Sequence, residues 1–392
     1  MTAKQTCHSP YRVVIVGAGV AGLETALALQ RLAGSRVEVS LLAPDHEFVY
    51  RPMSVREPFG GSVAKRYPID RVARDAGVKR YADSFKWIDR NSQVIHTTDH
   101  LELEYDAAVL AVGARRVPVL RHATTLDDHR LDEQLHGLIQ DIEQGYVHSL
   151  AFVVPSTRCW PLPAYELALM TAARAYAMNV ELKITFVTTE PWPLAMFGQA
   201  VSDRLRQMLG ECGITVIHAP DCQGREPGLL CLPRTGEVVK ADHIVALPEL
   251  YGPGLAGVPT SAHNGFLSVD PYSRVAGVEH LYAAGDATDF PVKFGGIAAL
   301  QADAAAASIA AEAGAQIEPK PMLPLIRGIL LGGREPLHIE AQISGSSATY
   351  SEANRKPFSE MPPKIHARYL EPYLESLDRQ AASTDSSLDL SA

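Results

Sequence analysis

The stretch GAGVAG, which begins at Gly17, constrains the fold of this chain more than any other feature. It places Gly17, Gly19 and Gly22 between a β-rich apolar run at 12–17 and a run at 20–33 with apolar residues at helical spacing. The first glycine permits a tight turn, the second lets backbone NH groups approach a pyrophosphate, and the third lets the helix pack closely on the strand. RVEVSLLA follows as a second strand, so the sequence predicts a βαβ unit that binds a dinucleotide.

The position that would hold the adenosine ribose carries no carboxylate. In such units a carboxylate is expected about 20 residues after the glycines. Here the second strand ends at SLLAPDHE, which places Ala43 and then Pro44 at that position. Asp45 or Glu47 could replace the carboxylate from the following loop, or backbone and water could hold the ribose instead. Both side chains are equally well explained as solvated loop charges, so these alternatives stay open.

Composition excludes several classes of function. The net charge of −9 and the isoelectric point near 5.9 give no basic surface for neutralising phosphates, so nucleic acid is not an expected partner. The five cysteines form no CxxC pair and no zinc-ligand spacing, and their odd number fits poorly with a secreted disulfide framework. We therefore expect a cytoplasmic protein without a metal site. No apolar run approaches the ~20 residues that a membrane-spanning helix needs.

A second alternation of strand and helix follows, but its turn lacks glycine. The strand HSLAFVV at 148–154 leads into a helix near 164–178 and then a strand at 180–189. The intervening turn reads VVPSTRCWPLPAYE. Because Cβ atoms would block a close approach of this backbone to a pyrophosphate, we do not expect a tightly bound second dinucleotide.

Three further stretches, taken with the first, resemble the flavoproteins that have two dinucleotide-binding domains. This superfamily includes pyridine nucleotide-disulfide reductases, type II NADH dehydrogenases and sulfide:quinone oxidoreductases. YDAAVLAVGARRVP is similar to the strand and glycine turn that closes over the cofactor, with Gly113 at the matching position. VEHLYAAGDATDFPVKFGGIAALQADAAAA is similar to the second FAD motif, and HEFVYRP to the segment that passes under the cofactor. The resemblance covers about residues 11–310.

The resemblance implies FAD and an α/β fold of two Rossmann-like, three-layer domains, the second inserted into the first. It implies the following division: a discontinuous FAD-binding domain (1–120 and 265–318), an inserted NAD(P)-binding-like domain without the glycine fingerprint (121–264), and a C-terminal segment (319–379). The composition of residues 380–392 predicts a disordered tail.

The resemblance also implies roles for single residues. Asp286 would bond the ribityl chain, and the helix that starts near Gly295 would direct its NH groups at the flavin pyrimidine, where reduced flavin carries negative charge. Lys293 would add positive charge there, or it is a solvated loop lysine. The cofactor-binding residues expected on this basis are Gly17, Gly19, Val20, Ala21, Gly22, Ala43, Pro44, Arg51, Pro52, Gly113, Gly285, Asp286, Gly295, Gly296 and Ile297.

The glycine-free turn is similar to that of the sulfide:quinone oxidoreductase branch, where a proline loop, a cysteine and an aromatic–Glu pair replace the fingerprint. The matching positions are Pro155, Cys159, Tyr165 and Glu166. A cysteine near a helix start has a lowered pKa and can act as a nucleophile, whereas most lone cysteines are small buried residues. Both interpretations stay open. The second redox cysteine of that branch has no counterpart, because no cysteine follows Cys231.

The C-terminal segment contains one amphipathic helix candidate, at 364–379. We expect its apolar face to pack onto the protein or to form a homodimer contact, and at most a peripheral membrane contact. The apolar residues are Ile365, Tyr369, Leu370, Tyr373 and Leu374, and the cations are Lys364, Arg368 and Arg379.

These observations favour an FAD-dependent oxidoreductase that moves two electrons from a small donor, such as sulfide or a thiol, to a quinone or another small acceptor. Cys159 and Lys293 are the candidate catalytic residues. Two alternatives are an NAD(P)H-dependent reductase that binds its nicotinamide loosely and a flavoprotein scaffold or sensor without turnover.

Overall fold

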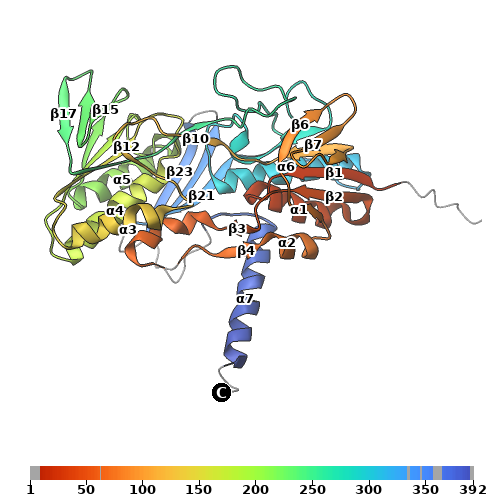
Figure 1. The fold of residues 1–392 in the computed structure, drawn as a ribbon, viewed down its shortest axis with the longest axis horizontal. Helices are drawn as coiled ribbons and strands as arrows, with labels where there is room; N and C mark the ends of the chain where they lie inside the picture. Colours follow the sequence, from red (N-terminus) through yellow and green to blue (C-terminus); the bar gives the residue numbers. More distant parts are fainter. Residues whose placement is uncertain (1–8, 62, 333–335, 345–346, 356–363, 389–392) are drawn as a thin grey trace, which may run out of the picture.

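The computed structural model describes residues 9–61, 63–332, 336–344, 347–355 and 364–388. Two α/β units lie side by side, and one helix projects away from them at the C-terminal end of the chain (Figure 1). In the part of the chain that the structure describes, no helix combines the length and the apolarity that crossing a bilayer requires.

The first unit is built on a parallel five-stranded sheet whose strands come from distant parts of the sequence. The strand order is β20 (Leu281–Ala283), β9 (Ala107–Leu110), β1 (Tyr11–Val16), β2 (Val37–Leu42), β5 (Lys79–Tyr81). Two helices of this unit pack against each other, α1 (Val20–Ala33) and α6 (Gly295–Glu312). Residues 13–16 of β1 are all buried, as expected for a parallel sheet that is covered on both faces.

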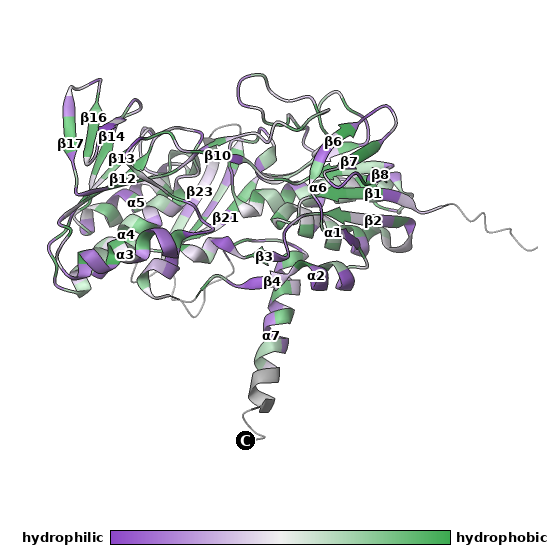
Figure 2. Cartoon of the chain, viewed as in Figure 1, coloured by the Kyte–Doolittle hydropathy of each residue, from purple (hydrophilic) through white to green (hydrophobic). Residues whose placement is uncertain are grey.

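The second unit repeats this plan from contiguous sequence. Its sheet is also parallel, in the order β11 (Thr124–Thr125), β18 (His243–Ala246), β12 (Ser149–Val154), β13 (Lys183–Thr188), β14 (Thr215–His218). Its helices are α3 (Leu131–Glu143), α4 (Leu162–Ala177) and α5 (Gln199–Glu211). Hydrophilic residues gather on outer helices such as α2 (Ile69–Asp75) and α3 (Figure 2). The predicted fold class, α/β with two Rossmann-like sheets, is confirmed.

Two adjacent strands carry the chain between the units. β10 (Arg115–Val117) leaves the first unit, and β19 (Glu249–Tyr251) leads back from the second. They pair antiparallel, with Arg115 opposite Tyr251 and Val117 opposite Glu249. We propose that this pair marks the borders of an inserted domain, close to the division at 120/121 and 264/265 that we predicted.

Smaller elements complete the fold. The remaining strands form antiparallel sheets: β3 (Glu47–Val49) with β4 (Arg66–Pro68); β6 (Phe85–Asp89), β7 (Val94–Thr97) and β8 (Glu102–Glu104); β15 (Gln223–Glu226), β16 (Leu229–Leu232) and β17 (Glu237–Lys240); and β21 (Leu325–Leu330), β22 (Leu337–Ser344) and β23 (Ser347–Arg355). The short 3-10 helices are η1 (Gly34–Arg36), η2 (Arg51–Phe59), η3 (Ala195–Phe197) and η4 (Gly285–Ala287).

The C-terminal helix differs from its prediction at both ends. α7 (Leu370–Leu388) begins later than residue 364 and continues through residues 380–388, where we predicted a disordered tail. Its start is set by Glu24 of α1, whose carboxylate accepts hydrogen bonds from the NH groups of Tyr369 (2.8 Å) and Leu370 (2.5 Å). Nucleation is the costly step of helix formation, and this start is fixed by the capping contact and by packing. Residues 389–392 of the predicted tail lie outside the described residues.

The first half of α7 packs onto the first unit, as we expected of this segment. Leu370, Leu374 and Leu377 are buried in the same core cluster as residues of α1 and α2. Asp378 then accepts hydrogen bonds from Lys65 (2.6 Å) and from the hydroxyl of Tyr67 (3.1 Å). The helix is therefore held to the first unit by its buried leucines and by the polar contacts of Asp378.

A buried ion pair joins four segments of the chain. Glu166 of α4 and Lys364, which precedes α7, lie 2.6 Å apart, with side chains only 1% and 4% exposed. Lys364 also donates to the carbonyl of Pro52 (2.8 Å), and the NH of Leu331 donates to Glu166 (2.9 Å). Burial raises the pKa of Glu166 and lowers that of Lys364, while their mutual attraction opposes both shifts. The prediction that Lys364 is a cation on a helix surface is wrong, because it lies before α7 and points inward.

Replacing Lys364 with Met should destabilise the protein by about 3–5 kcal/mol, because a buried carboxylate would lose its counter-charge. The double variant E166Q/K364M should recover part of this loss, because Gln keeps an acceptor for the NH of Leu331. Chemical denaturation of both single variants and the double variant measures the coupling. Lys65→Met breaks the exposed pair with Asp378 and should cost less than about 1 kcal/mol. An equally small loss of stability in Lys364→Met would contradict a buried ion pair between Glu166 and Lys364.

Candidate functional site

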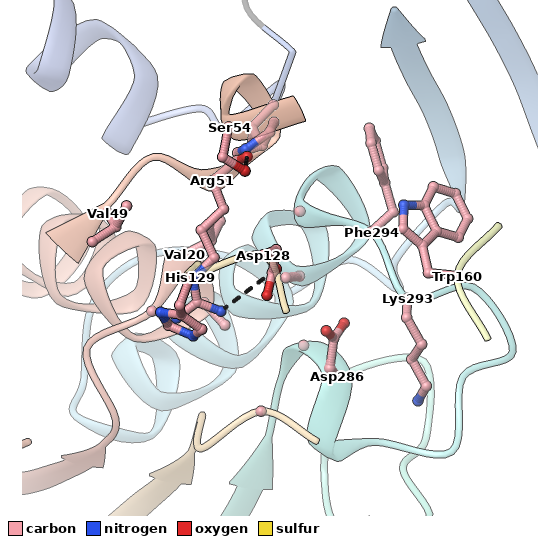
Figure 3. Close-up of a pocket in the computed structure, with 18 of the residues that line it drawn as sticks. Val20, Val49, Arg51, Ser54, Asp128, His129, Trp160, Asp286, Lys293 and Phe294 are labelled. Atoms are coloured by element: carbon pink, nitrogen blue, oxygen red, sulfur yellow. Dashed lines mark hydrogen bonds and ion pairs between the residues drawn. The ribbon is translucent and has the colours of Figure 1, made fainter. Parts of the chain in front are cut away.

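A cavity of about 770 Å³ lies where the two units and the C-terminal segment meet. The residues labelled in Figure 3 line this cavity and come from both units. The walls are formed by the glycine turn and start of α1, the loop after β2, η2, the turn after β9, the start of α6, the loop before α4, and residues 364 and 365.

Glycine is favoured for different reasons at the three positions of the first turn. Gly17 has φ +103°, and a Cβ there would lie 2.3 Å from the carbonyl oxygen of Ala111. A Cβ at Gly22 would lie 1.9 Å from the carbonyl oxygen of Gly17. A Cβ at Gly19 would meet no protein atom within 4 Å, because it would extend into open space. The fold itself therefore requires Gly17 and Gly22, whereas the open space beside Gly19 fits the close approach of a ligand.

The start of α6 reaches the same cavity. Gly295 and Asp286 line it, and a Cβ at Gly295 would lie 2.8 Å from the side chain of Ile365, which covers this helix end. Burial raises the pKa of Asp286, and the charges of Lys293 and Arg116 oppose this shift. Helix N-termini carry partial positive charge and unpaired NH groups. The cavity thus receives the N-termini of two helices, from distant parts of the sequence.

Lys293 was expected either to add positive charge at the flavin or to be a solvated loop lysine, and its surroundings fit neither description fully. Its ammonium group donates to the carbonyl of Thr288 and lies 3.9 Å from the ring centroid of Phe266. Its side chain runs away from Phe294 in Figure 3, although Lys293 contributes to the cavity wall. Burial lowers the pKa of Lys293 to about 8, while Asp286 opposes the shift. Lys293 is therefore a half-buried cation beside Asp286 and not a solvated loop lysine.

The loop after β2 places carboxylates at the cavity but not at the predicted position. Ala43 is fully buried in the core, and neither it nor Pro44 lines the cavity. Asp45 and Glu47 do line it. Glu47 also pairs with Arg66 at 3.5 Å. Asp45 and Glu47 therefore place carboxylates at this side of the cavity wall.

Most of the predicted cofactor residues line the cavity. They are Gly17, Gly19, Val20, Ala21, Arg51, Pro52, Gly113, Gly285, Asp286 and Gly295. The others do not line it: Gly22, Ala43, Gly296 and Ile297 are buried behind the wall, and Pro44 is exposed.

Cys159 does not have the environment of a reactive thiolate. It is 6% exposed, belongs to the core cluster of the second unit, and is not among the residues that line the cavity. Burial raises the pKa of Cys159 to about 12, and the charge of Glu249 acts in the same direction. The expected lowering of its pKa by a helix start is wrong, because α4 begins only at Leu162 and desolvation dominates. At neutral pH Cys159 is a thiol.

The start of α4 is also unsuited to an anion. Pro161 and Pro163 have no NH groups, and the NH groups of Ala164 and Tyr165 donate to the carbonyl of Pro161 at 3.1 and 3.4 Å. This helix end therefore lacks most of the donors that α1 and α6 present. The sequence-based expectation that the second unit holds no pyrophosphate agrees with this geometry.

Several residues of the cavity wall were not foreseen as site residues. Trp160 lies in the turn where other dinucleotide-binding units carry glycines. The absence of glycine there was the only feature of the local sequence that pointed to Trp160. Lys364 and the pair Asp128 and His129 reach the cavity through tertiary folding alone. Asp127, Asp128 and His129 lie close enough together to share an ion, but Asp128 pairs with Arg116 at 2.6 Å, which accounts for its charge.

Comparison with known proteins supports the resemblance found in the sequence. Residues 11–144 match the family described as pyridine nucleotide-disulphide oxidoreductase. The match begins at β1 of the first unit and ends after α3 of the second. The resemblance is thereby confirmed, and it implies a flavin cofactor.

Individual known proteins align with more of the chain than the family match does. Rhodocoxin reductase of Rhodococcus erythropolis is 26% identical over 71% of this chain, and the alignment spans 65% of that reductase. An NADH dehydrogenase-like protein of Mycobacterium tuberculosis is 27% identical over 70% of this chain and 72% of its own length. The fold is similar to that of the sulfide:quinone oxidoreductase of Aquifex aeolicus, with a TM-score of 0.80 and 19% identity over 94% of this chain and 90% of that chain.

Gly19→Ala should weaken flavin binding roughly tenfold or more, because a methyl group in the cradle costs about 1–3 kcal/mol of packing. The fold should survive, since Gly19 has φ −76° and its Cβ would meet no protein atom. Flavin content after purification and the unfolding temperature of the flavin-free protein measure the two effects. Gly210→Ala, in α5, is the matched control and should keep the flavin. Equal flavin retention in both variants would argue against a cradle at Gly19.

Cys159 should react slowly with iodoacetamide at pH 7–8, because it is buried and protonated, whereas the exposed Cys212 should react rapidly. Peptide mass spectrometry of protein labelled natively and after unfolding gives both rates. Rapid native labelling of Cys159 would restore it as a nucleophile candidate.

Proposed function

We propose that this protein is an FAD-dependent oxidoreductase that passes two electrons from a small donor, such as sulfide or a thiol, to a quinone or another small acceptor. The observation that carries the proposal is that the starts of α1 and α6 meet one cavity, whose other walls come from both units and from the C-terminal segment. The family of residues 11–144 and the fold shared with a sulfide:quinone oxidoreductase support the proposal.

The residues present fit FAD. The open space beside Gly19 and the first-turn NH groups of α1 would hold the pyrophosphate. Asp286 would bond the ribityl chain, and the NH groups at Gly295 would lie at the pyrimidine end. When bound, the flavin supplies the two-electron chemistry, and the protein supplies binding, orientation and electrostatics.

The Glu166–Lys364 pair is suited to hold a proton at the cavity wall. Both residues line the cavity and are otherwise buried. Because burial raises the pKa of Glu166 and lowers that of Lys364, their proton affinities approach each other. Since both residues line the cavity, we infer that the pair holds a proton beside a bound ligand, with Glu166 keeping Lys364 in place.

The second unit favours a donor without a pyrophosphate. The prolines at the start of α4 remove the NH groups on which dinucleotide binding depends. A loosely bound NAD(P)H is the second candidate, and it is supported by the name of the mycobacterial relative. A cytoplasmic location and a homodimer stay predictions.

An absorbance titration under anaerobic conditions tests the proposal. We expect yellow protein that contains FAD, that is bleached by sulfide or a thiol, and that is reoxidised by a soluble quinone. NADH and NADPH should bleach it far more slowly at equal concentration, because the start of α4 lacks most of the NH groups that would bind their pyrophosphate. Folded protein that is colourless and cannot be reconstituted with FAD would overturn the proposal. Fast bleaching by NADH or NADPH would select the second candidate.

A further inference from the structure

Trp160 connects the second unit to the start of α6. It lies in the loop between β12 and α4 and lines the cavity. Its ring centroid is 5.5 Å from that of Phe294 and 5.8 Å from that of Phe197. Phe294 is the N-cap residue of α6, so the aromatic contact reaches the helix end that faces the proposed flavin site. Figure 3 shows Trp160 and Phe294 side by side at one end of the cavity.

The loop that carries Trp160 is fixed to the connecting strand β19. The carbonyl of Arg158 accepts a hydrogen bond from the NH of Leu250 (3.1 Å). The guanidinium of Arg158 binds the buried carboxylate of Glu249 and the hydroxyl of Tyr251, and it lies 4.9 Å from the Tyr251 ring centroid. Because these contacts hold the backbone two residues before Trp160, the indole has a defined place in the wall.

The carboxylate that could hold a second ribose is already hydrogen-bonded to protein side chains. Glu190 follows β13, at the position where a carboxylate would hold a ribose in a βαβ unit. Its carboxylate accepts hydrogen bonds from the hydroxyls of Tyr165 (2.7 Å) and Thr188 (3.3 Å). Neither the start of α4 nor Glu190 therefore offers the second unit a place for a dinucleotide.

We propose that Trp160 is a specificity-determining residue which, together with Phe294, fills the side of the cavity toward the second unit and excludes donors as large as a substituted nicotinamide. Small donors still fit past it. The inference rests on the proposed function, and it names the side chain that sets the upper size of the donor.

Two variants and a control test this proposal. Trp160→Ala opens the wall, and Trp160→Leu does so partly while keeping apolar packing in case the Ala variant folds poorly. Trp192→Ala removes an exposed tryptophan that does not line the cavity. The bulky probe is N-benzyl-1,4-dihydronicotinamide, which has neither ribose nor pyrophosphate. It becomes the N-benzylnicotinamide cation, benzylated on the ring nitrogen, when it gives a hydride, with two electrons, to the flavin.

Bleaching of the flavin by this probe should accelerate about tenfold or more in Trp160→Ala and less in Trp160→Leu, because a steric barrier of this kind commonly costs 10–200-fold. Bleaching by sulfide should stay within about twofold of the unmodified protein, and Trp192→Ala should change neither rate. Acceleration by both donors alike, or by neither, would overturn the role of Trp160.

A binding measurement separates this inference from the proposed function. Oxidised N-benzylnicotinamide cannot reduce a flavin, so its affinity, measured by calorimetry, does not depend on turnover. It should bind Trp160→Ala about tenfold more tightly than the unmodified protein or Trp192→Ala. Equal affinities would overturn the inference even in an active enzyme. Tighter binding in a protein that no donor reduces would support the inference while the proposed function fails.

Discussion

The contact between Glu166 and Lys364 is the interaction on which the shape of the cavity depends. Removing two charges from water costs several kcal/mol each, and only close approach with further hydrogen bonds offsets that cost. Here the carbonyl of Pro52 and the NH of Leu331 supply those bonds. The pair therefore fixes the start of α4, η2 and the segment before α7 at one point of the wall. The two residues that hold the segments together also line the cavity.

The two βαβ units use the same architecture in opposite ways. In the first, glycines remove side-chain atoms at the turn and leave the helix end free for a ligand. In the second, prolines remove the NH groups, and Arg158 and Trp160 connect the turn to protein atoms. The second turn therefore contributes to the wall of a site that belongs mainly to the first unit.

Local sequence predicted those parts of the structure that local physics determines. The glycine turn, α1, α6 and the parallel strands follow from spacing and burial patterns within a few residues. Lys364 could not be placed in this way, because its partner Glu166 lies in another unit. The start of α7 depends on Glu24, near the other end of the chain, and the pKa of Cys159 depends on burial by distant segments. Each failure concerns a residue whose state is set by tertiary contacts.

The strand order of the first sheet has a consequence for how the protein is made. β20 and α6, which complete the first unit, are translated only after the whole of the second unit. The contiguous second unit can fold on the ribosome, as domains generally do, while β1, β2 and β9 still lack their last neighbour. The apolar edge of β9 is exposed during that interval, so nascent chains stalled before residue 281 are the species most in need of a chaperone.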